Sequence, residues 1–298
     1  MSDSEPTLDS VVAQRYRLLI AYDGALFHGW QRQVEPDGGE LRTVAGVVTS
    51  ALQRVLQQPV ELVGASRTDA GVHAKGQVAH FDAIPRVPVE RLSDAINSRL
   101  PKDVEVLSGQ AALPNFHAIR DAKKKQYRYR IFNSERRPLD RRHVVWHCWW
   151  SLNLDRMNDA ARRLIGTHDF AGFANAGHGR ASTVRTIHDC RVERGAEEST
   201  INIDVVGNGF LYNMVRIIAG TVVDAGRGQL EPSDVDRVLA TQDRRQAGPT
   251  LSPEGLCLQW IEYGGSDQES DEADREATER RRGDRGSNES SERHRKLV

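Results

Sequence analysis

The sequence predicts an α+β fold made of two similar halves. Two patterns alternate along the chain: short segments in which every second residue is apolar, as in half-buried strands, and longer ones in which apolar residues recur every three or four positions, as in amphipathic helices. In each half the order is strand, helix, strand, strand, helix, strand, although the residues themselves do not repeat. This recurrence predicts two ferredoxin-like halves whose antiparallel sheets meet at a central cleft.

The first half contains a strand at 15–22 and a helix at 43–57, which Pro59 ends. The remaining elements of this half are strands at 60–63 and 77–81, a helix at 89–100 that Pro101 ends, and a strand at 104–107. The second half has one additional helix. Its elements are a strand at 127–132, a helix at 155–165, strands at 183–192 and 201–206, a helix at 210–225, a short helix after Pro232 and a closing strand at 255–261.

Four segments follow from this layout. They are a disordered N-terminus at 1–14, an N-terminal α+β catalytic domain at 15–112, a C-terminal α+β domain at 113–263 and a charged tail at 264–298. The tail is rich in Ser, Glu, Asp and Arg, and it is too polar to bury a core. We therefore expect the tail to be disordered.

Composition indicates a soluble intracellular protein. The three cysteines lie far apart, which argues against a disulfide framework or a cysteine-based zinc site. No apolar run has the length of a membrane span, and the start of the chain is polar and acidic, unlike a secretory signal. We therefore expect a cytoplasmic protein without a membrane partner.

Positive charge is concentrated in the middle of the chain. The net charge is −1, but residues 15–263 hold 33 bases against 29 acids, and residues 120–142 hold ten bases against three acids. Within the second range, Lys125 and Tyr127 share one face of an alternating strand, and Arg128 lies on the other. A surface that holds phosphates and stacks bases needs such a mixture of cations and rings, although a plain solvated face is the alternative. The candidate RNA contacts are Lys123, Lys124, Lys125, Tyr127 and Arg128.

The strongest functional signal is the octet Arg67-Thr68-Asp69-Ala70-Gly71-Val72-His73-Ala74. In an extended segment, Arg67 and Asp69 project to the same side, so that the cation can keep the carboxylate ionised. The small neighbours of Asp69 leave room for a bulky ligand. For an arbitrary Arg-x-Asp sequence, the structural alternative is a tight loop with a solvated ion pair.

The octet closely resembles the signature of the tRNA pseudouridine synthase A family. Further segments resemble that family in the same order, and together they cover roughly residues 15–263. These segments are 22–24, 29–33, 116–118, 127–129, 166–170, 185–187 and 208–216. The departures are small: Ser66 stands where the family usually has a glycine, Ala45 replaces a common glutamine, and residues 34–42 form a longer polar loop.

The resemblance implies a pseudouridine synthase fold, a homodimer, and isomerisation of uridine at about positions 38, 39 and 40 of the tRNA anticodon stem and loop. It also implies that no metal or small-molecule cofactor takes part. In the site, it implies that Asp69 is the catalytic aspartate, that Arg216 contacts it, and that Tyr127 stacks on the target base and is a candidate for proton transfer at C5. We expect Arg67 and Arg216 to lie around Asp69.

The reaction explains these residue types. Breaking the N1–C1′ bond, turning the uracil and joining C5 to C1′ changes no redox state and adds no group, so that no cofactor is required. Asp69 could attack C1′, remove the C2′ proton to give a glycal, or attack C6 of the base, and the sequence leaves the three routes open. The target nucleotide must also be flipped out of its stack, and C5 must finally lose its proton.

Two other function classes remain open at this point. One is an RNA-binding module without activity, and the other is a hydrolase of glycosidic bonds, which would need a second carboxylate as proton donor. A metal site is also conceivable at His143, His147 and Cys148. That segment is mostly apolar and lacks a fourth ligand at suitable spacing, so we interpret it as a core strand.

Overall fold

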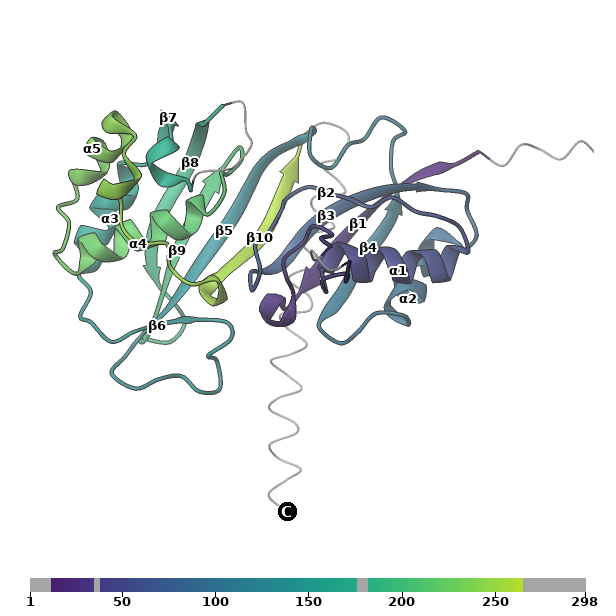
Figure 1. The fold of residues 1–298 in the computed structure, drawn as a ribbon, viewed down its shortest axis with the longest axis horizontal. Coiled ribbons are helices and arrows are strands. Elements are labelled where there is room, and N and C mark those ends of the chain that lie inside the picture. The colour runs from purple at the N-terminus through teal and green to yellow at the C-terminus, as the bar shows by residue number, and fades with distance from the viewer. Residues whose placement is uncertain (1–11, 35–37, 176–181, 265–298) are drawn as a thin grey trace, which may run out of the picture.

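The computed structural model describes residues 12–34, 38–175 and 182–264. In this part of the chain, ten strands form one continuous sheet, with helices grouped over its two ends (Figure 1). The strand order is β4-β1-β3-β10-β5-β9-β8-β7, with β2 paired to β3 and β6 paired to β5. Of the two ends predicted to be disordered, all but residues 12–14 and 264 lie outside the described residues.

The first half of the described chain forms one end of the sheet. Its elements are β1 (Gln14–Tyr22), α1 (Val44–Leu56), β2 (Val63–Gly64), β3 (His73–Ala83), α2 (Leu92–Asn97) and β4 (Val104–Ala111). β1 lies between β3 and β4 and pairs antiparallel with both. Helix α1 begins where predicted, because the Thr43 side chain accepts a hydrogen bond from the Gly46 N–H and caps the first turn.

The second half forms the other end. Its elements are β5 (Ala122–Asn133), β6 (Trp146–Cys148), α3 (Leu154–Arg162), β7 (Gly166–Asp169), β8 (Val184–Arg194), β9 (Thr200–Gly207), α4 (Met214–Gly226), α5 (Asp234–Thr241) and β10 (Leu256–Tyr263). Strands β5, β9, β8 and β7 pair antiparallel in that order. Helix α4 is almost wholly buried, so that side chains at its first turn are held on a rigid element.

β10 joins the two halves. It pairs antiparallel with β5 and parallel with β3, where Cys257 lies opposite His73. The α+β fold class predicted from the sequence is thus confirmed, but the two sheets meet edge to edge as one sheet. The predicted division at residue 112 falls in the connection between β4 and β5, and the separate domains remain a prediction.

Several element boundaries differ from the predictions, and two of them lie next to the candidate site. The helix predicted to begin at Phe210 begins at Met214, because Asn213 has a left-handed backbone with φ of 59° and φ,ψ values that interrupt a helix. The strand predicted at 60–63 is reduced to two residues, since only Val63 and Gly64 pair with β3. The strand β7 had no prediction, because its four residues are too short to show a period.

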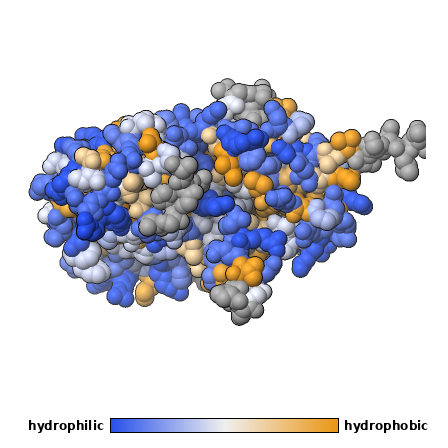
Figure 2. Space-filling view, turned by 45° about the horizontal axis from the view of Figure 1, so that its top comes forward, coloured by the Kyte–Doolittle hydropathy of each residue, from blue (hydrophilic) through white to orange (hydrophobic). Residues whose placement is uncertain are grey.

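The surface in Figure 2 is largely hydrophilic, with small and scattered hydrophobic patches. The larger apolar side chains pack between the sheet and the helices that cover it, and they form the core. Fully enclosed members are Leu18, Leu52, Tyr129, Phe170 and Ile217. Across the described residues, we find no helix that is both long enough and apolar enough to span a membrane.

Candidate active site

Asp69 lies in the loop between β2 and β3, and close backbone contacts fix this loop. The Val72 N–H donates to the Asp69 carbonyl at 3.1 Å, which closes a tight turn through Gly71, a residue with φ of +78°. On the other side of the loop, a Cβ added to Gly29 would lie 2.7 Å from the Thr68 carbonyl oxygen. The backbone of Asp69 therefore has little freedom.

Arg216 forms the ion pair with Asp69. Its Nη1 lies 3.5 Å from Asp69 Oδ2, and the two side chains are 16% and 26% exposed. The same guanidinium donates from Nε to the Leu251 carbonyl at 2.6 Å and from Nη1 to Asn213 Oδ1 at 2.8 Å. Arg216 is thus held in place by two neutral acceptors and aimed at the carboxylate.

The backbone around Arg216 explains this orientation. Gly220 lies one turn further along α4, and a Cβ there would lie 1.9 Å from the Pro249 carbonyl oxygen. Only glycine permits this approach, which brings the segment ending at Leu251 against α4. The Leu251 N–H in turn donates to the Arg216 carbonyl at 3.3 Å. Helix α4 and the segment that ends at Leu251 are therefore fixed to each other beside Asp69.

Two opposing effects act on the protonation of Asp69. Burial raises the pKa of the carboxyl group, and the positive charge of Arg216 lowers it. Burial is the larger of the two, so that the pKa of Asp69 is raised overall. Arg216 therefore limits the pKa rise that burial causes, which favours the ionised form near neutral pH.

Arg67 does not join this ion pair. The sequence predicts Arg67 and Arg216 on either side of Asp69, but the Arg67 side chain is exposed. Within the described residues, neither a hydrogen bond nor an ion pair links it to Asp69. The reason is local: Arg67 and Asp69 lie in an irregular stretch between a bend at 65–66 and a turn at 70–71, where the rule that positions two apart share a side of a strand does not apply.

Tyr127 lies on β5 and is buried with its hydroxyl engaged. Its Oη lies 3.0 Å from Ser66 Oγ, and the edge of one ring meets the face of the other in a contact with Phe210, 5.2 Å between centroids. Burial raises the pKa of Tyr127, the hydrogen bond with Ser66 lowers it, and the nearby charge of Asp69 raises it. Tyr127 is thus neutral and close enough to Asp69 to sense its charge.

The lysine run does not form one continuous track. Lys123 is exposed, whereas Lys124 lies 3.3 Å from Glu262 in a half-exposed ion pair. Lys125 is buried, and its Nζ donates to the Ala65 carbonyl at 2.6 Å. The prediction of Lys125 as a phosphate contact is therefore wrong, since its ammonium group is buried and hydrogen-bonded to the segment that precedes the octet.

Arg128 is also engaged within the protein. It makes two hydrogen bonds, each 2.7 Å long, to the two carboxylate oxygens of buried Asp204 on β9. Its side chain lies on the sheet face opposite Tyr127, because neighbouring side chains of a strand alternate. This placement agrees with the alternation seen in the sequence, and a role of Arg128 in binding substrate stays a prediction. Arg128 links two strands through a partly buried ion pair.

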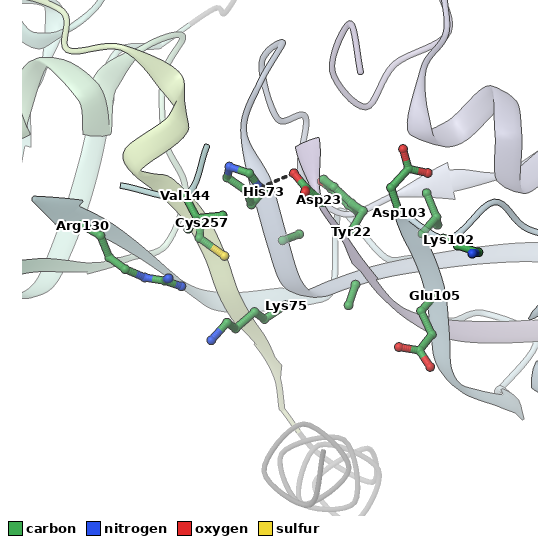
Figure 3. Close-up of a pocket in the computed structure, with 13 residues that line it drawn as sticks. Tyr22, Asp23, His73, Lys75, Lys102, Asp103, Glu105, Arg130, Val144 and Cys257 are labelled. Atoms are coloured by element: carbon green, nitrogen blue, oxygen red, sulfur yellow. Dashed lines mark ion pairs between the residues drawn. The ribbon is translucent and has the colours of Figure 1, made fainter. Parts of the chain in front are cut away.

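A separate cavity of about 320 Å³ lies on that opposite face (Figure 3). Arg130 lines it from β5, and Cys257 from β10, and Asp69 is not among its lining residues. In Figure 3, Asp23 and His73 face each other across 3.1 Å at its upper edge. The cavity is therefore distinct from the Asp69 site.

In the cluster of His143, His147 and Cys148, packing explains the last two residues, whereas His143 is exposed in a turn that precedes β6. Residues 146–148 form β6 beside β5, Cys148 is buried, and His147 Nε2 lies 2.7 Å from the Ser134 carbonyl oxygen. The core-strand interpretation is thus confirmed for β6. No group of three or more His, Cys, Asp or Glu side chains suited to a metal ion occurs in the part of the chain that the structure describes.

Comparison with known proteins identifies the family. Residues 18–121 and 160–264 match the family model described as tRNA pseudouridine synthase. The chain belongs to this tRNA pseudouridine synthase family. Asp69 lies in the first matched range and Arg216 in the second, so that both partners of the ion pair lie within the match, whereas Tyr127 lies between the two ranges.

Individual tRNA pseudouridine synthases are similar over almost their whole length. A tRNA pseudouridine synthase A of Thermoanaerobacter sp. is 42% identical over 246 residues, which cover 83% of this chain and 98% of the relative. The protein of the same name from Geobacter sulfurreducens is 43% identical, with the same two coverages. A chain in the crystal structure of a Cbf5-Nop10-Gar1 complex aligns with a TM-score of 0.32 and 9% identity, over 79% of this chain and 57% of that one.

Membership of the tRNA pseudouridine synthase family confirms the resemblance seen in the sequence, whereas the roles of single residues stay predictions. Sequence reasoning missed Leu251, whose backbone carbonyl holds Arg216, because a carbonyl contact leaves no mark on residue type. It also missed the contact of Ser66 with Tyr127. The signal available there was the departure at Ser66 from the usual family glycine.

Proposed function

We propose that this chain is a tRNA pseudouridine synthase that isomerises uridine to pseudouridine at about positions 38, 39 and 40 of the anticodon stem and loop. The observation that carries the proposal is the Asp69–Arg216 ion pair at 3.5 Å, next to buried Tyr127. The likeness to proteins named tRNA pseudouridine synthase A, at 42% identity over 98% of their length, supports the substrate.

Each residue of the site has a proposed task. Asp69 acts as nucleophile or base toward the ribose or the uracil, and Arg216 keeps its carboxylate ionised when the bound nucleotide excludes water. Tyr127 stacks on the flipped uracil and takes part in removing the C5 proton. The reaction rearranges one nucleoside without redox change, so the proposal includes no cofactor.

Two further features complete the proposal. We infer that the enzyme acts as a homodimer, with one site in each subunit, and that it works in the cytoplasm on tRNA. The resemblance to the family supports the dimer, and two subunits would enlarge the surface that contacts one tRNA. Sedimentation of the purified protein measures the assembly directly, and a monomer at working concentration would remove this part of the proposal.

Incubation with a uridine-containing tRNA transcript tests the function. We expect nucleoside analysis to find pseudouridine in the anticodon arm, without any added cofactor. Release of free uracil would instead indicate a hydrolase, and unchanged tRNA that remains bound would indicate a binding module. A hydrolase is disfavoured because glycoside hydrolysis uses paired carboxyl groups, and no second acid accompanies Asp69 within the octet 67–74.

Tyr127→Phe separates stacking from proton transfer. The variant keeps the ring but lacks the hydroxyl, so we expect tRNA affinity to remain and the release of tritium from C5-labelled tRNA to slow by about 10- to 100-fold. Tyr129→Phe is the matched control, since Tyr129 lies on the same face of β5 but donates to the Ser252 carbonyl. If Tyr127→Phe released tritium at the wild-type rate, stacking would be the only remaining role of Tyr127.

Lys123→Gln and Lys125→Gln should behave differently in salt titrations of tRNA binding. Exposed Lys123 can contact a phosphate, so its loss should reduce the slope of log affinity against log salt by about one unit. Lys125→Gln should leave that slope unchanged and lower the melting temperature, because its hydrogen bond to Ala65 is buried. An unchanged slope for Lys123→Gln would exclude Lys123 as a phosphate contact.

A further inference from the structure

Ser66 links the loop of Asp69 to the strand of Tyr127. Its Oγ lies 3.0 Å from Tyr127 Oη, and it precedes Asp69 by three positions. The Ser66 backbone is itself fixed by the fully buried side chain of Gln77: the Ser66 N–H donates to Gln77 Oε1 at 3.1 Å, and Gln77 Nε2 donates to the Ser66 carbonyl at 2.6 Å. The hydroxyl therefore projects from a rigid point.

A second contact also joins β5 to the segment that precedes Asp69. Lys125 lies two residues before Tyr127 on the same face of β5, and it donates to the Ala65 carbonyl. Lys125 and Tyr127, which are neighbours on that face, thus bind the adjacent residues Ala65 and Ser66. Since β10 lies between β3 and β5 in the sheet, both contacts bridge the two halves of the molecule.

We propose that Ser66 is a positioning residue that holds the phenol of Tyr127 at a fixed place relative to Asp69. The inference rests on the proposed isomerase function. Ser66 touches no reacting atom in this role. It provides a hydrogen-bond partner for the buried phenol of Tyr127, and it thereby sets the distance between Tyr127 and Asp69, which are proposed to act at the last and first steps of the reaction. Its hydrogen bond also lowers the pKa of Tyr127, against the rise that burial causes.

Removal of the Ser66 hydroxyl tests the proposal. We expect Ser66→Ala to slow single-turnover pseudouridine formation by about 3- to 10-fold, the range for a lost neutral hydrogen bond, with tRNA affinity unchanged. Ser66→Thr keeps a hydroxyl at the same position and should restore the rate to within about twofold. Ser50→Ala in α1 is the control, because Ser50 is exposed and its hydroxyl donates to the Gly46 carbonyl within the helix.

The same substitution in a Tyr127→Phe background isolates the contact. The phenol hydroxyl is absent there, so Ser66→Ala should cause no further loss, and the two effects should fail to add. If Ser66→Ala folds poorly, Ser66→Gly removes the same hydroxyl without adding bulk. Thermal denaturation of each variant shows whether a lower rate reflects a lower folded fraction.

Three outcomes decide the proposal. A Ser66→Ala enzyme at the wild-type rate would overturn it. An equal loss in both backgrounds would also overturn it, since Ser66 would then act on the loop alone. Rescue by threonine together with non-additivity supports it. If the wild-type enzyme formed no pseudouridine, the proposed function itself would fail, which is a different result from an active wild type that is insensitive to Ser66.

Discussion

Asp69→Asn is expected to abolish isomerisation while tRNA binding stays nearly intact. Asparagine keeps the shape of the side chain but can neither attack carbon nor accept a proton as a carboxylate does. Because the three chemical routes considered above all begin at this carboxylate, each predicts a loss of at least about 1,000-fold in the single-turnover rate. Filter binding with labelled tRNA and pseudouridine analysis of the same samples measure both quantities.

The loop around Asp69 makes this a clean comparison. Its turn is closed by backbone contacts, so that the substitution leaves the fold of the loop in place. Asp243→Asn is a suitable control, because Asp243 is engaged by Arg245 in a surface ion pair. A variant with asparagine at position 69 that retained a tenth of the wild-type rate would exclude Asp69 as the reacting group.

Arg216→Gln is expected to lower kcat by about 10- to 100-fold and to shift its acid limb to higher pH. Burial already raises the pKa of Asp69, and Arg216 opposes that rise, so removal of the cation lets the pKa rise further. The active form is the carboxylate. As pH falls, the variant therefore loses activity earlier than the wild type does.

Arg216→Lys separates charge from geometry. It retains the cation, so the acid limb should stay near its wild-type position. It cannot reproduce the fork that reaches Leu251, Asn213 and Asp69 together, so kcat should still fall. Arg227→Gln, at the far end of α4, is the matched control. If the acid limb were the same in Arg216→Gln and the wild type, Arg216 would have no part in ionising Asp69.

Local signals predicted much of the fold. Thr43 and Pro59 mark the two ends of α1 because capping and the lack of an N–H are properties of single residues. The start of α4 was misjudged because Phe210 and Leu211 continue the apolar period, whereas Asn213 breaks the backbone in a way that periodicity does not reveal. The place of β10 between β3 and β5 depends on contacts between distant residues and has no local signature.

The site was predictable where motif and spacing acted together. The octet indicated Asp69, and helical spacing together with the resemblance indicated Arg216. Alternation correctly assigned Lys125 and Tyr127 to one face, but it could not tell that this face is covered, and so it misjudged Lys125 as a surface cation. Arg67 was misplaced because two-residue spacing implies a shared side only in extended backbone.

The position of β10 has a consequence for how the protein is made. The strand that joins β3 to β5 is the last of the ten in the described chain, so a ribosome releases it only after every other strand. Until then the growing chain carries two unpaired strand edges in addition to those of β4 and β7, one on β3 and one on β5, which are open to pairing with other chains. Asp69 and Tyr127 are brought into register across the sheet only when this strand inserts. We therefore expect the nascent chain to be inactive, and most prone to aggregation, until β10 emerges.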